Sequence, residues 1–206
     1  GIVKDDYTLA TSLGGFTKGV SPLEMAAGFA TIENDGMYRE PTCIKTIIDS
    51  DENVVYASQM TEVSIYEQDA ARIMTDVLTT VMDSGTGRAL KLKGMPCAGK
   101  TGTTNDHKDG WFVGFTRYYT TSVWVGCDYP KAIQNLSGST YPGRIWNTYM
   151  SAIHENLSPM DFIPYAQLSD DFKNQQKQDQ QDQEQKREED NAAGQQDKID
   201  QNQQDQ

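Results

Sequence analysis

A glycine- and threonine-rich stretch, residues 94–104 (GMPCAGKTGTT), constrains the fold more than any other part of the 206-residue sequence. It matches the phosphate-binding pattern G-x-x-x-x-G-K-[ST], in which a glycine-rich turn must lead directly into a helix. Here Lys100 and Thr101 are followed by Gly102, two threonines, a polar turn and the aromatic run GWFVGF at 110–115. Glycine and β-branched residues disfavour a helix, and the alternation is typical of a strand. The sequence therefore predicts a β-hairpin and argues against a nucleotide site.

Two helices and one further hairpin are predicted upstream of this stretch. Ser21-Pro-Leu-Glu24 is a capping box with proline at the first helical position, and the helix it opens ends at Asn34-Asp-Gly36. Residues 43–58 contain two short β-branched runs around a polar turn, which is typical of a hairpin. A second capping box, Ser64-x-x-Glu67, predicts a longer helix that ends at the glycines of residues 84–87. Apolar residues at helical spacing predict the buried face of this second helix: Ala70, Ile73, Met74, Val77, Leu78, Val81 and Met82.

Three strand-like runs follow, at roughly 95–104, 110–117 and 120–128, and residues 146–157 have the pattern of a last helix. The predicted order is helix, hairpin, helix, antiparallel meander and helix. Such an order is typical of the α+β class, in which an antiparallel sheet packs with helices, rather than of alternating β-α units. Three aromatic residues of the meander are expected in the core rather than as substrate platforms: Trp111, Phe115 and Trp124.

The composition changes sharply at residue 169. Residues 169–206 hold 13 glutamines, 11 acidic and 5 basic residues, so they contribute −6 of the net charge of −12. Phe172 and Ile199 are their only large apolar side chains, which predicts a disordered acidic tail. Residues 158–168 are expected to connect this tail to a folded body at 1–157. Because body and tail are both acidic, nucleic acid is not expected as a partner.

The cysteines and histidines do not suggest a metal site. Cys43, Cys97 and Cys127 are widely spaced, without a C-x-x-C pair, and the only histidines are His107 and His154. We therefore expect no metal and no cofactor, and we expect the cysteines to be small buried or half-buried side chains. His107 falls in the hairpin turn, where it is expected to be solvated.

Four motifs occur together in an order and at spacings that carry a resemblance. They are GVSPLEMAAGFATIENDGMY at 19–38, SGTGRAL at 84–90, AGKTGTTNDHKDGWFVGFT at 98–116 and SVWVGCD at 122–128. Residues 8–157 resemble the C-terminal part of the transpeptidase domain of penicillin-binding proteins, and most closely the class A, bifunctional ones. The resemblance implies the penicillin-binding and β-lactamase-like α+β fold. It also implies that the chain is a penicilloyl-serine transferase, or part of one.

In this family a serine attacks the D-Ala-D-Ala end of a peptidoglycan stem peptide, an amine then takes the acyl group, and β-lactams mimic the donor. The resemblance implies that Lys100 places a cation beside the substrate carboxylate, with hydroxyl groups from Thr101 and Thr103. It further implies that Gly102 lets the peptide lie against the strand, and that the Thr103 N–H lines the oxyanion hole. Thr104 completes the expected substrate-binding set. Strict alternation would put Lys100 and Thr101 on opposite faces of the strand, so that meeting one anion would need local twist.

Two other family motifs are not found. No serine in the chain is followed three residues later by lysine, and none begins Ser-x-Asn. Since the first residue is Gly1, we expect a truncated or processed portion of a transpeptidase, inactive on its own. The glycosyltransferase domain and the membrane anchor would then lie upstream, with the enzyme on the extracytoplasmic face of the bacterial plasma membrane. The alternative is a catalytically dead remnant that serves as a binding or scaffold module.

Overall fold

The computed structural model describes residues 2–165 and residue 178, and divides the chain into one compact unit at Gly1–Pro164 and a second at Tyr165–Gln206. Its elements are η1 (Lys4–Asp6), η2 (Leu9–Leu13), α1 (Pro22–Glu33), β1 (Met37–Arg39), β2 (Thr46–Ile48), β3 (Val54–Ala57), β4 (Glu62–Ser64), α2 (Gln68–Asp83), η3 (Arg88–Leu90), β5 (Ala98–Thr103), β6 (Gly110–Phe115), β7 (Thr120–Val125) and α3 (Tyr141–Ile153). The tail predicted at 169–206, except residue 178, lies outside the described residues. Both the tail and the predicted boundary at 157 therefore stay predictions.

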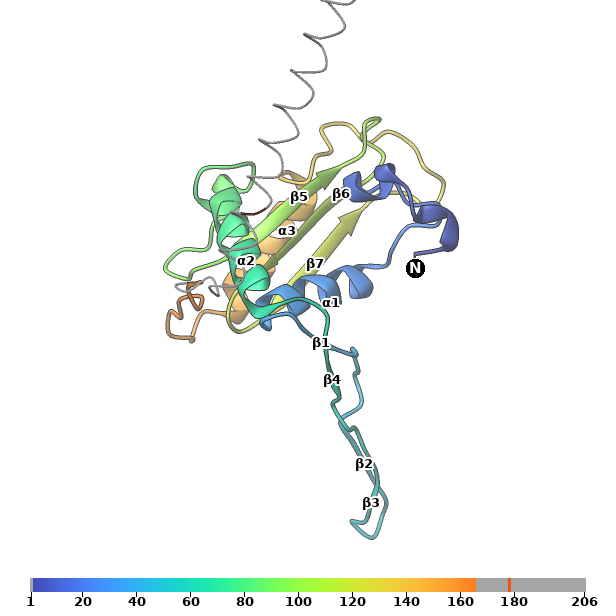
Figure 1. Ribbon diagram of the computed structural model, residues 1–206, viewed down its shortest axis with the longest axis vertical. Helices are drawn as coiled ribbons and strands as arrows, with labels where there is room; N and C mark the ends of the chain where they lie inside the picture. The colour runs from blue at the N-terminus through green and yellow to red at the C-terminus, as the bar shows by residue number, and fades with distance from the viewer. Residues whose placement is uncertain (1, 166–177, 179–206) are drawn as a thin grey trace, which may run out of the picture. The chain divides into compact units, whose positions relative to one another are not determined.

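The first unit is built on an antiparallel sheet with the order β5-β6-β7 (Figure 1). Helix α1 lies on one face and α3 on the other, while α2 lies beside β5. This arrangement confirms the predicted α+β class and the meander, although each strand is shorter than its predicted run.

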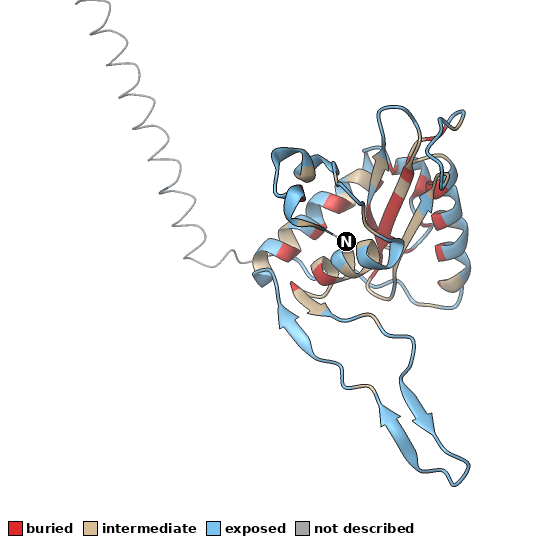
Figure 2. Ribbon diagram, turned by 90° about the vertical axis from the view of Figure 1, so that its right-hand side faces the viewer, coloured by how far each residue is buried: buried red, intermediate tan, exposed pale blue. Residues whose placement is uncertain are grey.

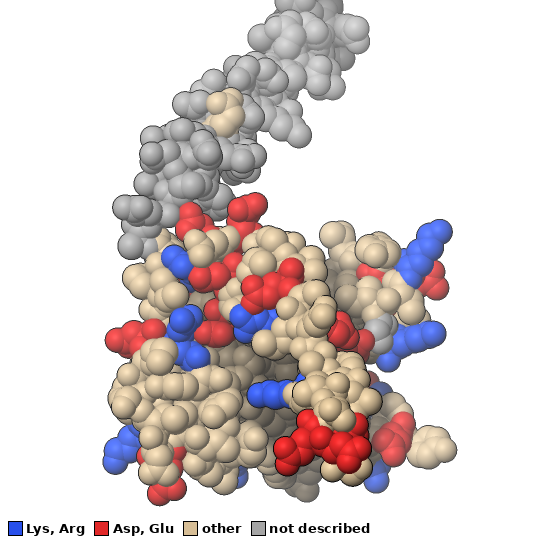
Figure 3. All heavy atoms as spheres, turned by 90° about the horizontal axis from the view of Figure 1, so that it is seen from below, with Lys and Arg blue, Asp and Glu red and all other residues tan. Residues whose placement is uncertain are grey.

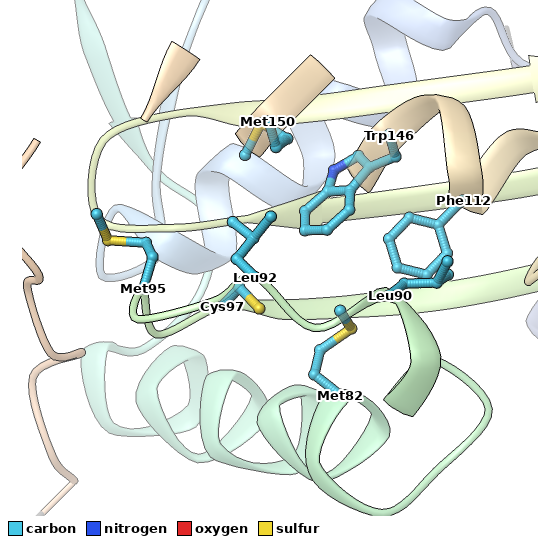
Figure 4. Packing of buried hydrophobic residues seen from close by; sticks show 8 residues of the cluster. All are labelled: Met82, Leu90, Leu92, Met95, Cys97, Phe112, Trp146 and Met150. Carbon is cyan, nitrogen blue, oxygen red and sulfur yellow. The ribbon is translucent and has the colours of Figure 1, made fainter. Parts of the chain in front are cut away.

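Two apolar clusters hold the layers together. The larger one lies between the sheet and α3 and contains Met82, Leu90, Leu92, Met95, Cys97, Phe112, Trp146 and Met150 (Figure 4). Its centre is Trp146, whose ring lies 4.9 Å from that of Phe112 and whose indole N–H donates to the Gly114 carbonyl at 3.1 Å. A Cβ at Gly114 would come within 2.6 Å of the Trp146 ring, so only glycine allows this packing. The second cluster, on the α1 face, contains Leu78, Ala98 and Phe115.

The first capping box is confirmed and the second is wrong. Ser21 accepts from the Glu24 N–H at 3.2 Å, while the Glu24 carboxylate accepts from the Ser21 N–H at 2.8 Å. Ser64 instead lies in β4, opposite Met37 of β1, and α2 begins at Gln68 without a side-chain cap. Pairing with β1 holds this segment extended, and that tertiary contact overrides the local signal.

The buried face of α2 differs in part from the predicted stripe. Leu78 and Met82 are buried, as expected, but Met74 and Val77 are 46% and 51% exposed. Buried Thr75 lies on the inner face instead, because its hydroxyl donates to the Ala71 carbonyl one turn earlier. A polar group that is hydrogen-bonded within the helix can be buried without a large desolvation cost.

The last helix begins earlier and ends earlier than predicted. It spans Tyr141–Ile153 rather than 146–157, with Pro142 in its first turn. Proline at the start of a helix is favoured because the N–H it lacks would have no partner there. This signal was present in the sequence and was missed.

The predicted hairpin at 43–58 is confirmed as β2 and β3, which pair with each other in a separate two-stranded ribbon. Strands β1 and β4 form a second pair at its base, and the β2–β3 ribbon projects from the rest of the first unit (Figures 1 and 2). Every residue of β2 and β3 is exposed.

Candidate functional site

Strand β5 carries the Lys-Thr-Gly sequence at one edge of the sheet. It pairs with β6 on one side, with Lys100 opposite Val113 and Gly102 opposite Trp111. On its other side no strand within residues 2–165 pairs with it. The predicted site residues therefore lie along an open edge, beside the turn that follows α2.

The hydrogen-bond alternation shows which backbone groups point out of this edge. The Thr104 N–H donates to the Asp109 carbonyl at 3.1 Å, so this pair is hydrogen-bonded across the hairpin. In an antiparallel ladder every second residue is bonded to the neighbouring strand, and the residues between point the other way. By this rule Gly102 and Lys100 bond to β6, whereas the N–H and carbonyl groups of Thr101 and Thr103 point outward.

The side chains of Lys100 and Thr101 lie on opposite faces, as strict alternation predicts. The Lys100 side chain lies on the same face of the strand as Ala98, which packs with Phe115 in the cluster on the α1 face. Its ammonium is exposed and donates to the Thr101 carbonyl at 2.9 Å. Because that carbonyl points out of the edge, the long side chain of Lys100 brings its charge to the edge itself.

Thr101 lies on the other face, where its hydroxyl is 2.8 Å from that of Thr86. Thr86 belongs to the turn at 84–87, which is fixed by the Gly87 N–H donating to the Val81 carbonyl at 2.9 Å. This contact joins two of the four motifs of the resemblance. Residues 84–87 are expected from the sequence to form a tight turn beside the site, and the contact places this turn there; the pattern did not reveal that Thr86 positions the Thr101 hydroxyl.

Thr103 is also held in place, by the loop of residues 134–140. Its hydroxyl accepts from the Gly138 N–H at 3.0 Å, which leaves its own proton available for a further acceptor. A Cβ on Gly138 would come within 2.7 Å of the Thr101 Cβ and 2.8 Å of the Gly102 nitrogen. Gly138 therefore packs directly on the Lys-Thr-Gly strand, which the sequence pattern did not reveal.

Thr104 and His107 shape the β5–β6 turn. The Thr104 hydroxyl accepts from the N–H groups of Lys108 and Asp109 at 3.0 and 2.9 Å, so it is occupied within the turn. His107 is exposed, as expected, but its Nδ1 lies 2.8 Å from the Leu136 carbonyl. This bond ties the turn to the loop that contacts Thr103.

The aromatic expectations are only partly met. Phe115 is fully buried and Trp111 is half-buried, but Trp124 is 36% exposed, and its indole N–H donates to the Asp109 carboxylate at 3.0 Å. The prediction that Trp124 is a core residue is therefore wrong. Trp124 lies on β7 directly opposite Trp111, with the two ring centroids 6.4 Å apart.

The cysteines also differ from the expectation at one position. Cys97 is buried and Cys127 half-buried, as predicted, but Cys43 is exposed next to the ribbon. Burial raises the pKa of the Cys97 thiol, which keeps it a neutral core side chain. In the described part of the chain, no group of three or more histidine, cysteine or acidic residues could hold a metal ion. None of the helices within residues 2–165 is long and apolar enough to cross a membrane.

Comparison with known proteins agrees with this geometry. A family model described as the penicillin binding protein transpeptidase domain matches residues 2–151. The chain belongs to this family. Penicillin-binding protein 4 of Bacillus subtilis is 34% identical over 153 residues, which cover 74% of this chain and 24% of that protein. Penicillin-binding protein 1A of Clostridium acetobutylicum is 34% identical over 158 residues, which cover 76% of this chain and 19% of that protein.

A solved structure supports the same fold. The crystal structure of penicillin-binding protein 1A from Haemophilus influenzae matches with a TM-score of 0.70 at 22% identity, covering 81% of this chain and 31% of that one. The relatives named penicillin-binding protein 1A confirm the resemblance to the class A proteins. The chain spans only 19% to 24% of the length of the two curated relatives named above. What the whole protein does is therefore a matter of proposal.

Proposed function

We propose that β5 is the substrate-binding strand of a serine-type D,D-transpeptidase that cross-links peptidoglycan. The open edge of β5, with the Thr101 and Thr103 backbone groups pointing outward, is the observation that carries this proposal. An extended stem peptide ending in D-Ala-D-Ala adds to such an edge as a further strand, and a β-lactam occupies the same place. A nucleotide is not expected here, because Lys100 and Thr101 lie in a strand rather than at the start of the helix that a phosphate-binding loop requires.

Each residue of the strand has a role in this proposal. Lys100 brings a positive charge to the edge and pairs with the terminal carboxylate of the donor. The Thr103 hydroxyl donates the proton that its bond from Gly138 leaves available, and the Thr103 N–H stabilises the developing oxyanion. Gly102 lacks a side chain that would hold the peptide away, Thr101 is fixed by its contact with Thr86, and Thr104 orders the turn that follows the strand.

The attacking serine and its lysine base are not supplied by a Ser-x-x-Lys motif of this sequence. The acyl-transfer reaction therefore needs residues beyond these 206, in a protein on the extracytoplasmic face of the bacterial plasma membrane. We expect the chain alone not to be labelled covalently by penicillin, because no acyl-enzyme forms without the nucleophile. The second candidate is a binding or scaffold module without catalysis, which the same absence favours.

A chimaera tests the proposal. The part of Bacillus subtilis penicillin-binding protein 4 that precedes the matched segment is joined to this 206-residue chain, and labelling by a fluorescent penicillin is timed. We expect labelling, with Lys100→Ala slowing it about ten- to a hundredfold, because one charge-assisted contact contributes roughly 1.5–3 kcal/mol. Lys108→Ala is the matched control, since Lys108 lies in the adjoining turn and pairs with Asp106. Unchanged labelling in Lys100→Ala would contradict the assignment, and a folded but unlabelled chimaera would favour the scaffold candidate.

A further inference from the structure

The β2–β3 ribbon exposes more apolar surface than a two-stranded hairpin can shield. Ile47 is 48% exposed, Ile48 and Val54 are each 61% exposed, and Val55 is 67% exposed. The ribbon projects away from the sheet, and nothing in the described residues covers its faces (Figure 2). An isolated hairpin is marginally stable in water, whereas three or more strands stabilise one another. This ribbon is therefore suited to adding strands.

The two outer edges of the ribbon are not equivalent. Ile47 pairs with Tyr56 and Ile48 with Val54, so Val55 is an extra residue that makes β3 irregular. A bulge of this kind disrupts the spacing of backbone groups and blunts a strand edge. Strand β2 has no such irregularity, which leaves its edge as the one that can accept another strand.

The backbone direction of β2 follows from the bonds at its two ends. The Ser58 N–H donates to the Lys45 carbonyl at 2.8 Å, and the Asp49 N–H donates to the Asn53 carbonyl at 3.0 Å. The backbone N–H and carbonyl groups of Lys45 and Asp49 therefore point inward, toward β3, as do those of Ile47 between them. The backbone groups of Thr46 and Ile48 consequently point outward, at the edge of the ribbon.

We propose that β2 pairs antiparallel with β2 of a second copy of this chain, about a two-fold axis at Ile47. In this register Thr46 forms a hydrogen-bonded pair with Ile48 of the partner subunit, and Ile48 with the partner's Thr46. A two-fold axis that passes through a residue, rather than between two residues, matches outward groups with outward groups, and an axis at Ile47 centres the pairing on β2. The result is a four-stranded sheet in which Ile47 meets its own symmetry mate across the axis.

Charge selects this register and direction. The turn of the ribbon is acidic, with Asp49, Asp51 and Glu52, and acidic side chains gather on the face seen from the ribbon end (Figure 3). A parallel arrangement would bring two such turns together. The antiparallel register at Ile47 instead places Lys45 directly opposite Asp49 of the partner subunit, twice per dimer. The bonds that Asp49 accepts from Asn53 hold its pKa below the usual value, so the carboxylate is charged at neutral pH.

The pairing involves few residues, so the association is weak, with a Kd on the order of 10–100 µM. Sedimentation equilibrium of the full chain from about 5 to 300 µM should show a monomer–dimer equilibrium. Thr46→Pro should abolish the dimer, because proline removes an outward N–H without breaking a bond inside the ribbon. Ala57→Pro is the matched control, since Ala57 faces Thr46 across the ribbon and its own N–H points out of the β3 edge.

A cross-link tests the register independently of proline. At a non-hydrogen-bonded pair the Cα atoms are about 4.5 Å apart, within the range of a disulfide. In a Cys43→Ser, Cys127→Ser background, Ile47→Cys should form a disulfide-linked dimer under mild oxidation, whereas Tyr56→Cys on β3 should not. Lys45→Glu should weaken association about tenfold by facing two like charges. A chain that stays monomeric at 300 µM, equal loss of the dimer in Thr46→Pro and Ala57→Pro, or cross-linking through Tyr56→Cys rather than Ile47→Cys would each overturn the proposal.

Discussion

Gly138→Ala is the substitution that most directly tests how the Lys-Thr-Gly strand is held. A methyl group at this position would lie 2.5 Å from the Trp111 carbonyl oxygen, 2.7 Å from the Thr101 Cβ and 2.8 Å from the Gly102 nitrogen. These atoms belong to two paired strands and cannot move aside as a flexible side-chain end could. The loop of residues 134–140 must therefore shift away from β5.

The magnitude follows from two contributions. Overpacking of this kind costs about 1–3 kcal/mol. The shift also breaks the bond from the Gly138 N–H to the Thr103 hydroxyl, which contributes about 0.5–1.5 kcal/mol. Because the two effects share one displacement, we expect a total loss of about 2–3 kcal/mol in the free energy of unfolding.

Urea unfolding followed by tryptophan fluorescence measures this loss, and amide exchange at Gly138 reports the bond itself. Gly28→Ala is the control, because Gly28 lies within α1 and a Cβ there has no atom within 4 Å apart from its chain neighbours and its own helix backbone. Alanine in a helix interior should stabilise the protein by about 0.5–1 kcal/mol. If the free energy of unfolding of Gly138→Ala lies within about 0.5 kcal/mol of the parent value and the amide of residue 138 stays protected from exchange, the packing of this loop on β5 is not as described.

Three further perturbations are expected to have defined outcomes. Trp146→Phe should lower the free energy of unfolding by about 2 kcal/mol, because it leaves the buried Gly114 carbonyl without its donor, and an unchanged urea midpoint would contradict this. The hydrogen bonds from Arg72 hold the pKa of the Asp35 carboxyl below its usual value. The contribution of this ion pair to the free energy of unfolding is therefore complete above about pH 4 and is lost as the pH falls through the lowered pKa. Asp35→Asn should therefore reduce the dependence of the free energy of unfolding on pH below about pH 4. An unaltered pH dependence would contradict the pairing of Asp35 with Arg72. Deleting residues 169–206 should leave the free energy of unfolding unchanged, as their composition predicts, and a change beyond about 0.5 kcal/mol would show that they contribute to the fold.

The two capping boxes show where local sequence is sufficient and where it is not. Both have a serine followed three residues later by glutamate, yet only Ser21 caps a helix. The difference lies outside the motif, because the N–H groups of Ile65 and Tyr66 donate to the Gly36 carbonyl and keep the second segment extended. Gly36 is about thirty residues away, so no pattern within a window of helix length could have revealed this contact.

Local sequence also predicts only part of the candidate site, and tertiary contacts decide the rest. The strand character of the Lys-Thr-Gly segment and the opposite faces of its side chains followed from residue types and alternation alone. The contacts that fix the strand come from Thr86 and Gly138, which lie 15 and 35 residues away from their partners in the sequence. A motif indicates which residues form a strand, but only the packed chain shows what holds that strand in position.

The opposite faces of Lys100 and Thr101 also bear on how a ligand would bind. A ligand lying on either face of the sheet would meet one of these side chains and not the other. At the edge both become available, because the Lys100 ammonium lies 2.9 Å from the Thr101 carbonyl, which points outward with the Thr103 N–H. Because the lysine side chain is long enough to bring its ammonium to the edge, a ligand can meet both residues there without the local backbone twist that strict alternation would require. Under the proposed function, a ligand in the plane of the sheet is therefore the one arrangement that meets the cation and the outward N–H groups together, which favours strand addition over binding to a face.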